Sequence, residues 1–465
     1  MAGSRKYHER TIAPVGDPLA AAGQLVAARQ GHDHVCYEGP EGYAVAVDPV
    51  AEVIADRRRL VVRTDEGRRT LPFSAAALRG LPALLDEVPV EAWRCYGWAG
   101  FELAAARDGL AELLDDEPLL HLMIPRVEVR FHATGTLLRA LDVADLDVLQ
   151  AELESAPPVR LPAGPTPVDD WDAEAYLHAV DRAIGTIRSG RLQKVILSRT
   201  VPVAFPVDLA ATYQLGRRAN TPARSYLLRL GGLAATGFSP ETVVEVAKGW
   251  VTTQPVAGTR ARTGRGELDE SLRRELLTDP KEVYEHAISV KVAVDELAEL
   301  CPGAPVEVPE FMSVRERGSV QHLASTVRSP LAAAGHAWDA FSALFPAVTT
   351  SGVPKRAAYE VIHELEPSAR GLYGGAVLTY DADGAMDAAV ALRTVYQRDG
   401  RSWLQAGAGI VGTSLPEREL TETREKLATI ARYLVAREPD RAVGERRGHP
   451  STATQEMGEP CSRSA

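Results

Sequence analysis

Two segments of the sequence each carry a pair of glutamates spaced three residues apart, namely Glu282 with Glu285 and Glu419 with Glu422. Side chains at this spacing project from the same face of a helix. Four carboxylates on two helices suit Mg²⁺, a hard cation that prefers oxygen ligands. We therefore expect a Mg²⁺ site between the two segments. The alternative is a solvated surface on which glutamates and lysines simply support each helix.

The first glutamate pair requires a helix that begins just before it. Asp279 is a suitable N-cap, and Pro280 suits the first helical position. His286 in the same segment has no second histidine four residues away, and the sequence contains no CxxC. These spacings argue against zinc.

The second glutamate pair follows a strand and a glycine-rich stretch. Gly407-Ala408-Gly409 predicts a turn whose free backbone N–H groups could hold an anion. Ser414 with Glu417 predicts a capping box at the start of the helix. Lys426 lies four residues after Glu422, so it shares the face of the two glutamates.

Other charged or titratable residues lie within apolar segments, where a charge requires a partner or a functional role. Lys194 opens the strand Lys194–Arg199 and is either a base whose pKa is lowered by burial or an ordinary edge lysine. Glu241 in GFSPE is either a general acid or a turn carboxylate, and His322 is either functional or a core histidine. Arg393 in the apolar strand ALRTVY needs a partner, and a carboxylate ligand suits its planar fork.

Two smaller features could contact a ligand. Gly258 and Thr259 form a small polar turn that could bind an anion, although such turns are common. Tyr373 precedes two glycines, so it could reach into a pocket or pack in the core.

Length and composition limit the class of protein. A chain of 465 residues indicates two domains or one large unit. The net charge of −11 and the lack of a lysine or arginine stripe argue against nucleic acid as the main partner. The four scattered cysteines fit a reducing cytosol. We see no secretory signal and no apolar run of about 20 residues, and we expect a cytoplasmic monomer without a membrane partner.

The pattern of elements indicates an α+β fold. Runs typical of strands mostly follow one another, with helices inserted singly, which favours mainly antiparallel sheets. We divide the chain into four parts: a loose lead-in (1–20), an N-terminal part of the fold (21–165), a catalytic region (166–437) and a disordered tail (438–465). The proline-rich stretch Ser155–Asp170 is the expected linker.

Taken in order, the motifs of the second half resemble the chorismate-utilising enzymes, the family of anthranilate synthase component I, aminodeoxychorismate synthase, isochorismate synthase and salicylate synthase. The resemblance is dense over residues 170–435. It rests on KVILSR, GFSPE, PVAGTR, DPKEVYEH, RERGSVQHLAS, TTSGVPK, LYGGA, ALRTVY, QAGAGIV and PERELTETREKL.

This resemblance implies a chorismate-binding fold of two packed, mainly antiparallel sheets with helices on the outside. It also implies that Lys194 is the base that activates water and Glu241 the acid on the opposite face of the ring. Glu285 and Glu422 would hold Mg²⁺, supported by Glu282 and Glu419. The pyruvyl carboxylate would contact the remaining binding residues, Arg393, Tyr373, Lys426 and the backbone N–H groups of Gly407, Ala408 and Gly409.

The stretches from RERGSVQHLAS and from QAGAGIV resemble most closely the salicylate-forming members of siderophore pathways. They imply conversion of chorismate through isochorismate to salicylate and pyruvate, with His322 and Thr349 lining the region where pyruvate leaves. The alternatives are an enzyme that stops at isochorismate, an aminodeoxychorismate synthase, or a non-catalytic protein that binds an aromatic metabolite.

Overall fold

The computed structural model describes residues 4–29, 31–155, 171–333 and 335–437. Most of the expected linker, residues 156–170, and the expected tail, residues 438–465, lie outside the described residues. None of the described helices combines the length and the apolar character that crossing a lipid bilayer requires.

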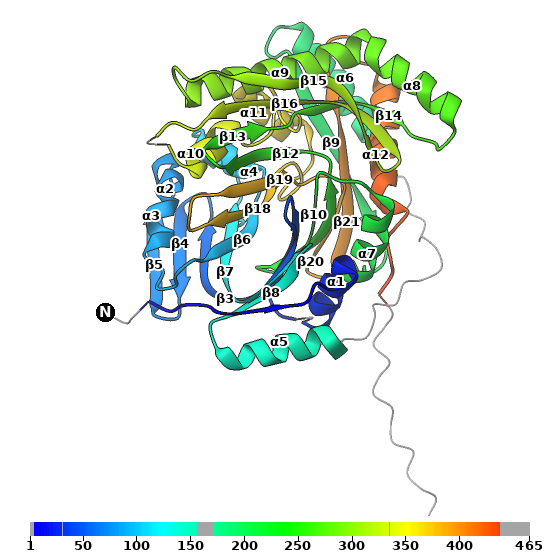
Figure 1. The fold of residues 1–465 in the computed structure, drawn as a ribbon. Helices are drawn as coiled ribbons and strands as arrows, with labels where there is room; N and C mark the ends of the chain where they lie inside the picture. The colour runs from blue at the N-terminus through cyan, green and yellow to red at the C-terminus, as the bar shows by residue number, and fades with distance from the viewer. Residues whose placement is uncertain (1–3, 30, 156–170, 334, 438–465) are drawn as a thin grey trace, which may run out of the picture.

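The 21 described strands pair antiparallel in one continuous network, which divides into two packed sheets, as expected (Figure 1). The first sheet contains, in order across it, β1 (His8–Ile12), β8 (Gly135–Ala140), β7 (Leu120–His132), β3 (Gly42–Ala55), β2 (His34–Gly39), β10 (Arg224–Leu230), β11 (Leu233–Ser239), β20 (Thr394–Arg398), β21 (Arg401–Ile410), β9 (Lys194–Val203) and β17 (Gly352–Val353). The second contains β5 (Gly67–Pro72), β4 (Arg59–Thr64), β3, β7, β6 (Arg94–Ala99), β18 (Ala376–Asp381), β19 (Met386–Val390), β12 (Thr242–Ala247), β13 (Trp250–Thr253) and β16 (Val320–Pro330), which also pairs with β14 (Val256–Ala261) and β15 (Glu307–Arg317).

The long strands β3 and β7 belong to both sheets. The N-terminal half of β3 pairs with β2, its C-terminal half pairs with β4, and β7 accompanies it throughout. Pro49 and Pro125 face each other at the point where the register shifts. Because proline has no N–H to donate, it suits the place where the two sheets diverge.

The apolar core between the two sheets follows the two-residue period of the strands. Val35 and Tyr37 of β2 point into the space between the sheets, where they meet Tyr96 and Trp98 of β6. Cys36 points to the opposite side of the first sheet and packs under helices. The sheets are thus held face to face by buried aromatic and aliphatic side chains.

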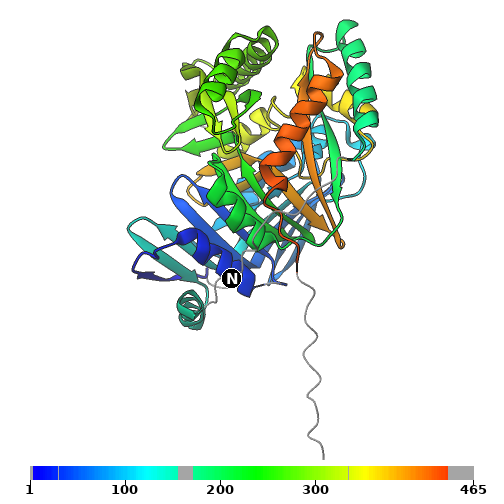
Figure 2. The same ribbon diagram turned by 90° about the vertical axis from the view of Figure 1, so that its right-hand side faces the viewer.

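Helices cover the outer faces. The first sheet is covered by α1 (Pro18–Ala28), α5 (Val143–Ser155), α7 (Leu209–Ala219) and α12 (Pro416–Ala431). A second group of helices packs into a separate apolar cluster. It consists of α2 (Ala75–Arg79), α3 (Leu81–Asp86), α4 (Glu102–Arg107), α6 (Ala173–Arg188), α9 (Pro280–Leu300), α10 (Ala337–Leu344) and α11 (Lys355–Leu365). α8 (Gly266–Thr278) packs on β14, η1 (Ala111–Leu113) follows α4, and α12 lies beside α6 (Figure 2).

Two local expectations differ from the structure. The expected lead-in contains β1, which pairs with β8 because Ile12 packs into the core under the first sheet. Arg393 was expected within a strand, but the chain leaves β19 in the second sheet and enters β20 in the first sheet at this point. Arg393 adopts a positive φ of 52° where the chain crosses between the sheets.

Candidate active site

Helices α9 and α12 bring the four glutamates together in the interior. Glu282, Glu285, Glu419 and Glu422 are each at most 4 % exposed, which excludes the solvated surface that was the alternative. The predicted N-cap of α9 is confirmed, since the Asp279 carboxylate accepts hydrogen bonds from the second and third backbone N–H groups of the helix.

The four carboxylates surround the ammonium group of Lys281, which the sequence analysis missed. Its Nζ lies 3.2 Å from Glu285, 3.4 Å from Glu419 and 3.7 Å from both Glu282 and Glu422. Lys281 lies four residues before Glu285, so the two share a face of α9, as Lys426 and Glu422 share a face of α12. The length of its side chain lets the ammonium reach the middle of the group.

The second glutamate of each helix has a further ammonium partner. Glu285 lies 3.2 Å from Lys194 Nζ, and Glu422 lies 2.8 Å from Lys426 Nζ. Burial alone would raise the pKa of both carboxyls, but these neighbouring cations lower it, so both are ionised. Lys426 Nζ also donates to the carbonyl of Gly407.

The first glutamate of each helix has a weaker set of partners. Glu282 accepts a hydrogen bond of 2.9 Å from Arg260, which the sequence analysis also missed, yet burial still raises its pKa. Burial raises the pKa of Glu419 to about 7, against the opposing effect of Lys281. The two helices therefore each present one firmly ionised carboxylate and one that protonates more readily.

The donor set fits the chemistry of Mg²⁺, which prefers carboxylate oxygens. One buried oxygen each of Glu282, Glu285 and Glu422 accepts no hydrogen bond within the described part of the chain. Among the described residues, however, no three ligating side chains already stand close enough to share one metal ion. Lys281 occupies the space between them, so a divalent ion would have to take over its contacts.

Lys194 is fully buried at the start of β9. Its ammonium donates to Ser289 Oγ at 3.0 Å in addition to its contact with Glu285. Burial lowers the pKa of Lys194, and Glu285 opposes that effect. A lysine whose pKa is lowered can accept a proton near neutral pH.

Glu241 lies in the short connection between β11 and β12, and it is 2 % exposed. Thr349 Oγ1 donates a 2.5 Å hydrogen bond to one of its oxygens, while the other accepts none among the described residues. Burial raises the pKa of Glu241 to about 8. Its carboxyl group therefore carries a proton at neutral pH and can act as an acid.

His322, Thr259 and Arg393 form a second polar group in the same pocket. His322 Nδ1 lies 3.0 Å from the carbonyl of Gly258 and 3.2 Å from Thr259 Oγ1. A carbonyl only accepts, so we place the ring proton on Nδ1, and Nε2 then accepts from Arg393 Nη2. Burial and then Arg393 lower the pKa of His322 well below its usual value, so the ring is neutral.

The expected turn at Gly407-Ala408-Gly409 is wrong, because these residues lie within β21 and pair with β9. The glycines serve close approach instead. A Cβ on Gly409 would lie 1.9 Å from Glu285 Oε1, and one on Gly407 would lie 2.8 Å from the Tyr373 hydroxyl. The absence of side chains on one face of β21 therefore admits Glu285 and Tyr373 to the pocket.

The expected capping box of α12 is also wrong. The N-cap is Leu415, and its side chain caps no backbone N–H of the helix. Ser414 Oγ instead accepts from the backbone N–H of Val411 and so stabilises the loop that follows β21.

Most of the predicted residues converge on one small cavity of about 60 Å³. It is lined by Glu241, Gly258, Thr259, Glu285, His322, Thr349, Tyr373, Arg393, Gly407, Gly409 and Lys426. Ala408 points away from it, as strand alternation requires. Lys194, Glu282, Glu419 and Glu422 lie behind the lining rather than in it.

With this geometry in view, comparisons with known proteins identify the family. Residues 30–432 match the model of the chorismate binding enzymes. The chain is 41 % identical over 435 residues to a salicylate synthase of Mycolicibacterium paratuberculosis, covering 91 % of this chain and 95 % of that one. It is 37 % identical to anthranilate synthase component 1 of Bacillus caldotenax, covering 65 % and 59 % of the two chains.

Solved structures share the fold. Anthranilate synthase component I of Streptococcus pneumoniae superposes with a TM-score of 0.71 at 26 % identity, covering 84 % of this chain and 92 % of that one. The menaquinone-specific isochorismate synthase of Escherichia coli gives a TM-score of 0.69 at 23 % identity, covering 92 % and 96 %. The chain belongs to the chorismate binding enzyme family.

Proposed function

We propose that this protein is a Mg²⁺-dependent salicylate synthase that converts chorismate through isochorismate to salicylate and pyruvate. The proposal depends on the presence in one site of a buried, protonated Glu241 and a buried Lys194 whose pKa is lowered. Hydration of chorismate at one ring position with loss of hydroxide at another requires one base and one acid. The near-full-length similarity to a salicylate synthase supports the choice of product.

The charges of the site are suited to a metal ion and a dianionic substrate together. The four glutamates are balanced by Lys281, Lys194, Lys426 and Arg260. Chorismate carries two carboxylates, and one bound Mg²⁺ would neutralise that added charge and hold the ring carboxylate. Glu285 and Glu422, with Glu282 and Glu419 in support, would be its ligands.

Arg393 is the best candidate to bind the pyruvyl carboxylate. It is buried and pairs with no carboxylate among the described residues, so burial and then Arg317 lower its pKa. A carboxylate of the ligand would compensate that cost. Tyr373 and Lys426 lie in the same cavity, and His322 and Thr349 line it.

Substrate binding requires the pocket to expand. Its free volume of about 60 Å³ corresponds to about two water molecules. Arg393 and His322 both line this space and contact each other, so a carboxylate ligand of Arg393 would replace that contact with an ion pair. Loss of pyruvate from isochorismate then depends mainly on holding the side chain folded over the ring.

Product analysis tests the proposal. Purified protein is incubated with chorismate and Mg²⁺, and salicylate is followed by fluorescence and pyruvate by a coupled reduction. We expect both products in equal amounts, and neither when a chelator removes the metal. Isochorismate without pyruvate would assign the protein to isochorismate synthesis, and formation of an aminated product with ammonia would assign it to aminodeoxychorismate synthesis.

A further inference from the structure

Arg370 is a buried arginine outside the catalytic pocket whose guanidinium binds two catalytic segments at once. It donates from Nη1 to the carbonyl of Thr350 at 2.6 Å and from Nη2 to the carbonyl of Ile196 at 2.7 Å. Thr350 follows the threonine that binds Glu241, and Ile196 lies two residues after Lys194 on β9. The same side chain therefore contacts the strand of the base and the loop beside the acid.

Glu366 extends this contact along β9. It pairs with Arg370 through both oxygens, and it accepts from Ser198 N at 2.7 Å and from Ser198 Oγ at 2.9 Å. Ser198 in turn accepts from Gln405 of β21. Lys194, Ile196 and Ser198 alternate along one face of the strand, so the ion pair holds the face that carries the base.

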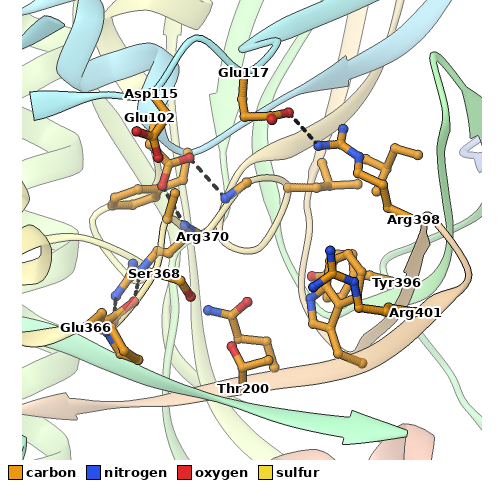
Figure 3. A pocket seen from close by; sticks show the side chains of 18 of the residues that line it. Glu102, Asp115, Glu117, Thr200, Glu366, Ser368, Arg370, Tyr396, Arg398 and Arg401 are labelled. Carbon is orange, nitrogen blue, oxygen red and sulfur yellow. Dashed lines mark hydrogen bonds and ion pairs between the residues drawn. The ribbon is translucent and has the colours of Figure 1, made fainter. Parts of the chain in front are cut away.

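Further contacts fix Arg370 itself. Glu102 accepts from the backbone N–H groups of Arg370 and Gly371 at 2.6 and 3.0 Å (Figure 3). The guanidinium carbon lies 4.4 Å from the centre of the Phe101 ring and 5.6 Å from that of Tyr373, which lines the catalytic pocket. These contacts restrict the movement of the Arg370 side chain, so its guanidinium can hold both segments in place.

We propose that Arg370 is a positioning residue that keeps the base strand β9 and the Thr349–Thr350 loop at a fixed separation. The role rests on the proposed function, since it assigns the base and acid to those segments. A buried ion pair that only stabilises the core is the alternative. A fixed separation matters because a displacement of about 1 Å of a catalytic group can cost about a hundredfold in rate.

A large cavity behind Arg370 makes the proposal testable by chemical rescue. It has a volume of about 810 Å³, and its lining includes Phe101, Glu102, Glu366, Arg370 and Gln405. Gln405 is the one described residue that lines both this cavity and the catalytic pocket. A small cation could therefore reach the position of the Arg370 guanidinium without passing through the catalytic pocket (Figure 3).

The first experiment compares Arg370→Lys, which keeps the charge but loses the fork, with the wild type. We expect kcat for chorismate consumption to fall about ten- to a hundredfold with KM changed much less. Arg370→Ala should lose more, and added guanidinium should restore part of kcat while methylammonium at the same concentration should not. An unchanged kcat in Arg370→Lys would overturn the proposal. A fall in kcat that is accompanied by a lower melting temperature and is not rescued by guanidinium would also overturn it.

The second experiment does not depend on catalysis. Amide hydrogen exchange is measured on Arg370→Lys and on Arg191→Lys, a control on an exposed arginine that also pairs with glutamates. We expect faster exchange in residues 194–200 and 347–352 together, only for Arg370→Lys. Unchanged exchange in either segment would overturn the proposal that Arg370 positions both segments. An inactive wild type with this exchange pattern would count against the proposed function alone.

Discussion

Helices α9 and α12 carry the same pair of carboxylates but neutralise them differently. On α12 the second glutamate, Glu422, is paired with Lys426 one turn further along the same helix. On α9 the corresponding Glu285 is paired both with Lys281 of the same helix and with Lys194 of β9. Neutralisation of Glu422 is therefore local in sequence, whereas that of Glu285 also requires a strand from elsewhere in the chain.

The difference assigns different work to the two ammonium groups. Lys426 also donates to the Gly407 carbonyl and so fixes α12 against β21. Lys194 is fully buried, and its partner Glu285 would also serve as a metal ligand. Binding of a cation by Glu285 would weaken its hold on Lys194, which would make the lysine a better base.

The largest effect is expected at the base. Lys194→Ala should lower kcat about 10²- to 10⁴-fold, since it removes general base catalysis. Circular dichroism should show that the variant is folded, and Lys291→Ala, an exposed lysine of α9, should keep wild-type activity. Normal turnover by Lys194→Ala would show that the base lies elsewhere.

The second prediction separates the second glutamate of each helix, Glu285 and Glu422, from the first, Glu282 and Glu419. Glu282→Gln and Glu419→Gln should raise the Mg²⁺ concentration for half-maximal activity about 10- to 100-fold, as supporting groups do. Glu285→Gln and Glu422→Gln should raise it more, because these ionised carboxylates would be the direct ligands of the metal ion. Mg²⁺ titration of activity measures the order, and equal effects at all four positions would remove the distinction.

A smaller effect is expected on the acid side of the pocket. Because the pKa of Glu241 is raised to about 8, its carboxyl is protonated below that pH and activity should fall above it. The hydrogen bond from Thr349 lowers this pKa, so Thr349→Val should move the alkaline limb to higher pH. A pH profile of kcat/KM measures the limb, and a shift to lower pH would contradict the assignment.

The smallest expected effect compares the two helix starts. Asp279→Ala should cost about 1 kcal/mol in the free energy of unfolding, because it removes the cap of α9. Ser414→Ala should cost less, since Ser414 caps no N–H of α12. Urea denaturation in the presence of a chelator measures both, and Asp279→Asn, which can still cap, serves as the control.

What the sequence could predict follows from the range of the interactions. The mainly antiparallel pairing, the N-cap of α9 and the shared faces of the glutamate pairs depend on local sequence patterns, and the structure has them, whereas the two packed sheets were implied by the family resemblance. Lys281 was missed although its spacing of four residues from Glu285 is a local signal. Arg260 and Ser289 were missed because a helical face does not show which strand lies opposite, and no local signal in the sequence points to their contacts.

The glycines of β21 illustrate the second limit. Gly407 and Gly409 were interpreted as a turn, because glycine tolerates bends. Their role became clear only with the positions of Tyr373 and Glu285, which approach the strand where a Cβ would collide. A glycine required for tertiary contact has the same sequence signal as one required for a turn.

The N-terminal strands that complete each sheet have a consequence for how the gene can be divided. β10 pairs with β2, and β18 pairs with β6. Both β2 and β6 come from the first third of the polypeptide. A fragment that starts at residue 166 would retain all the proposed catalytic side chains yet present two bare sheet edges, an invitation to aggregate. Selection must therefore act on the two portions as a single inherited unit, even though the chemistry is encoded in only one of them.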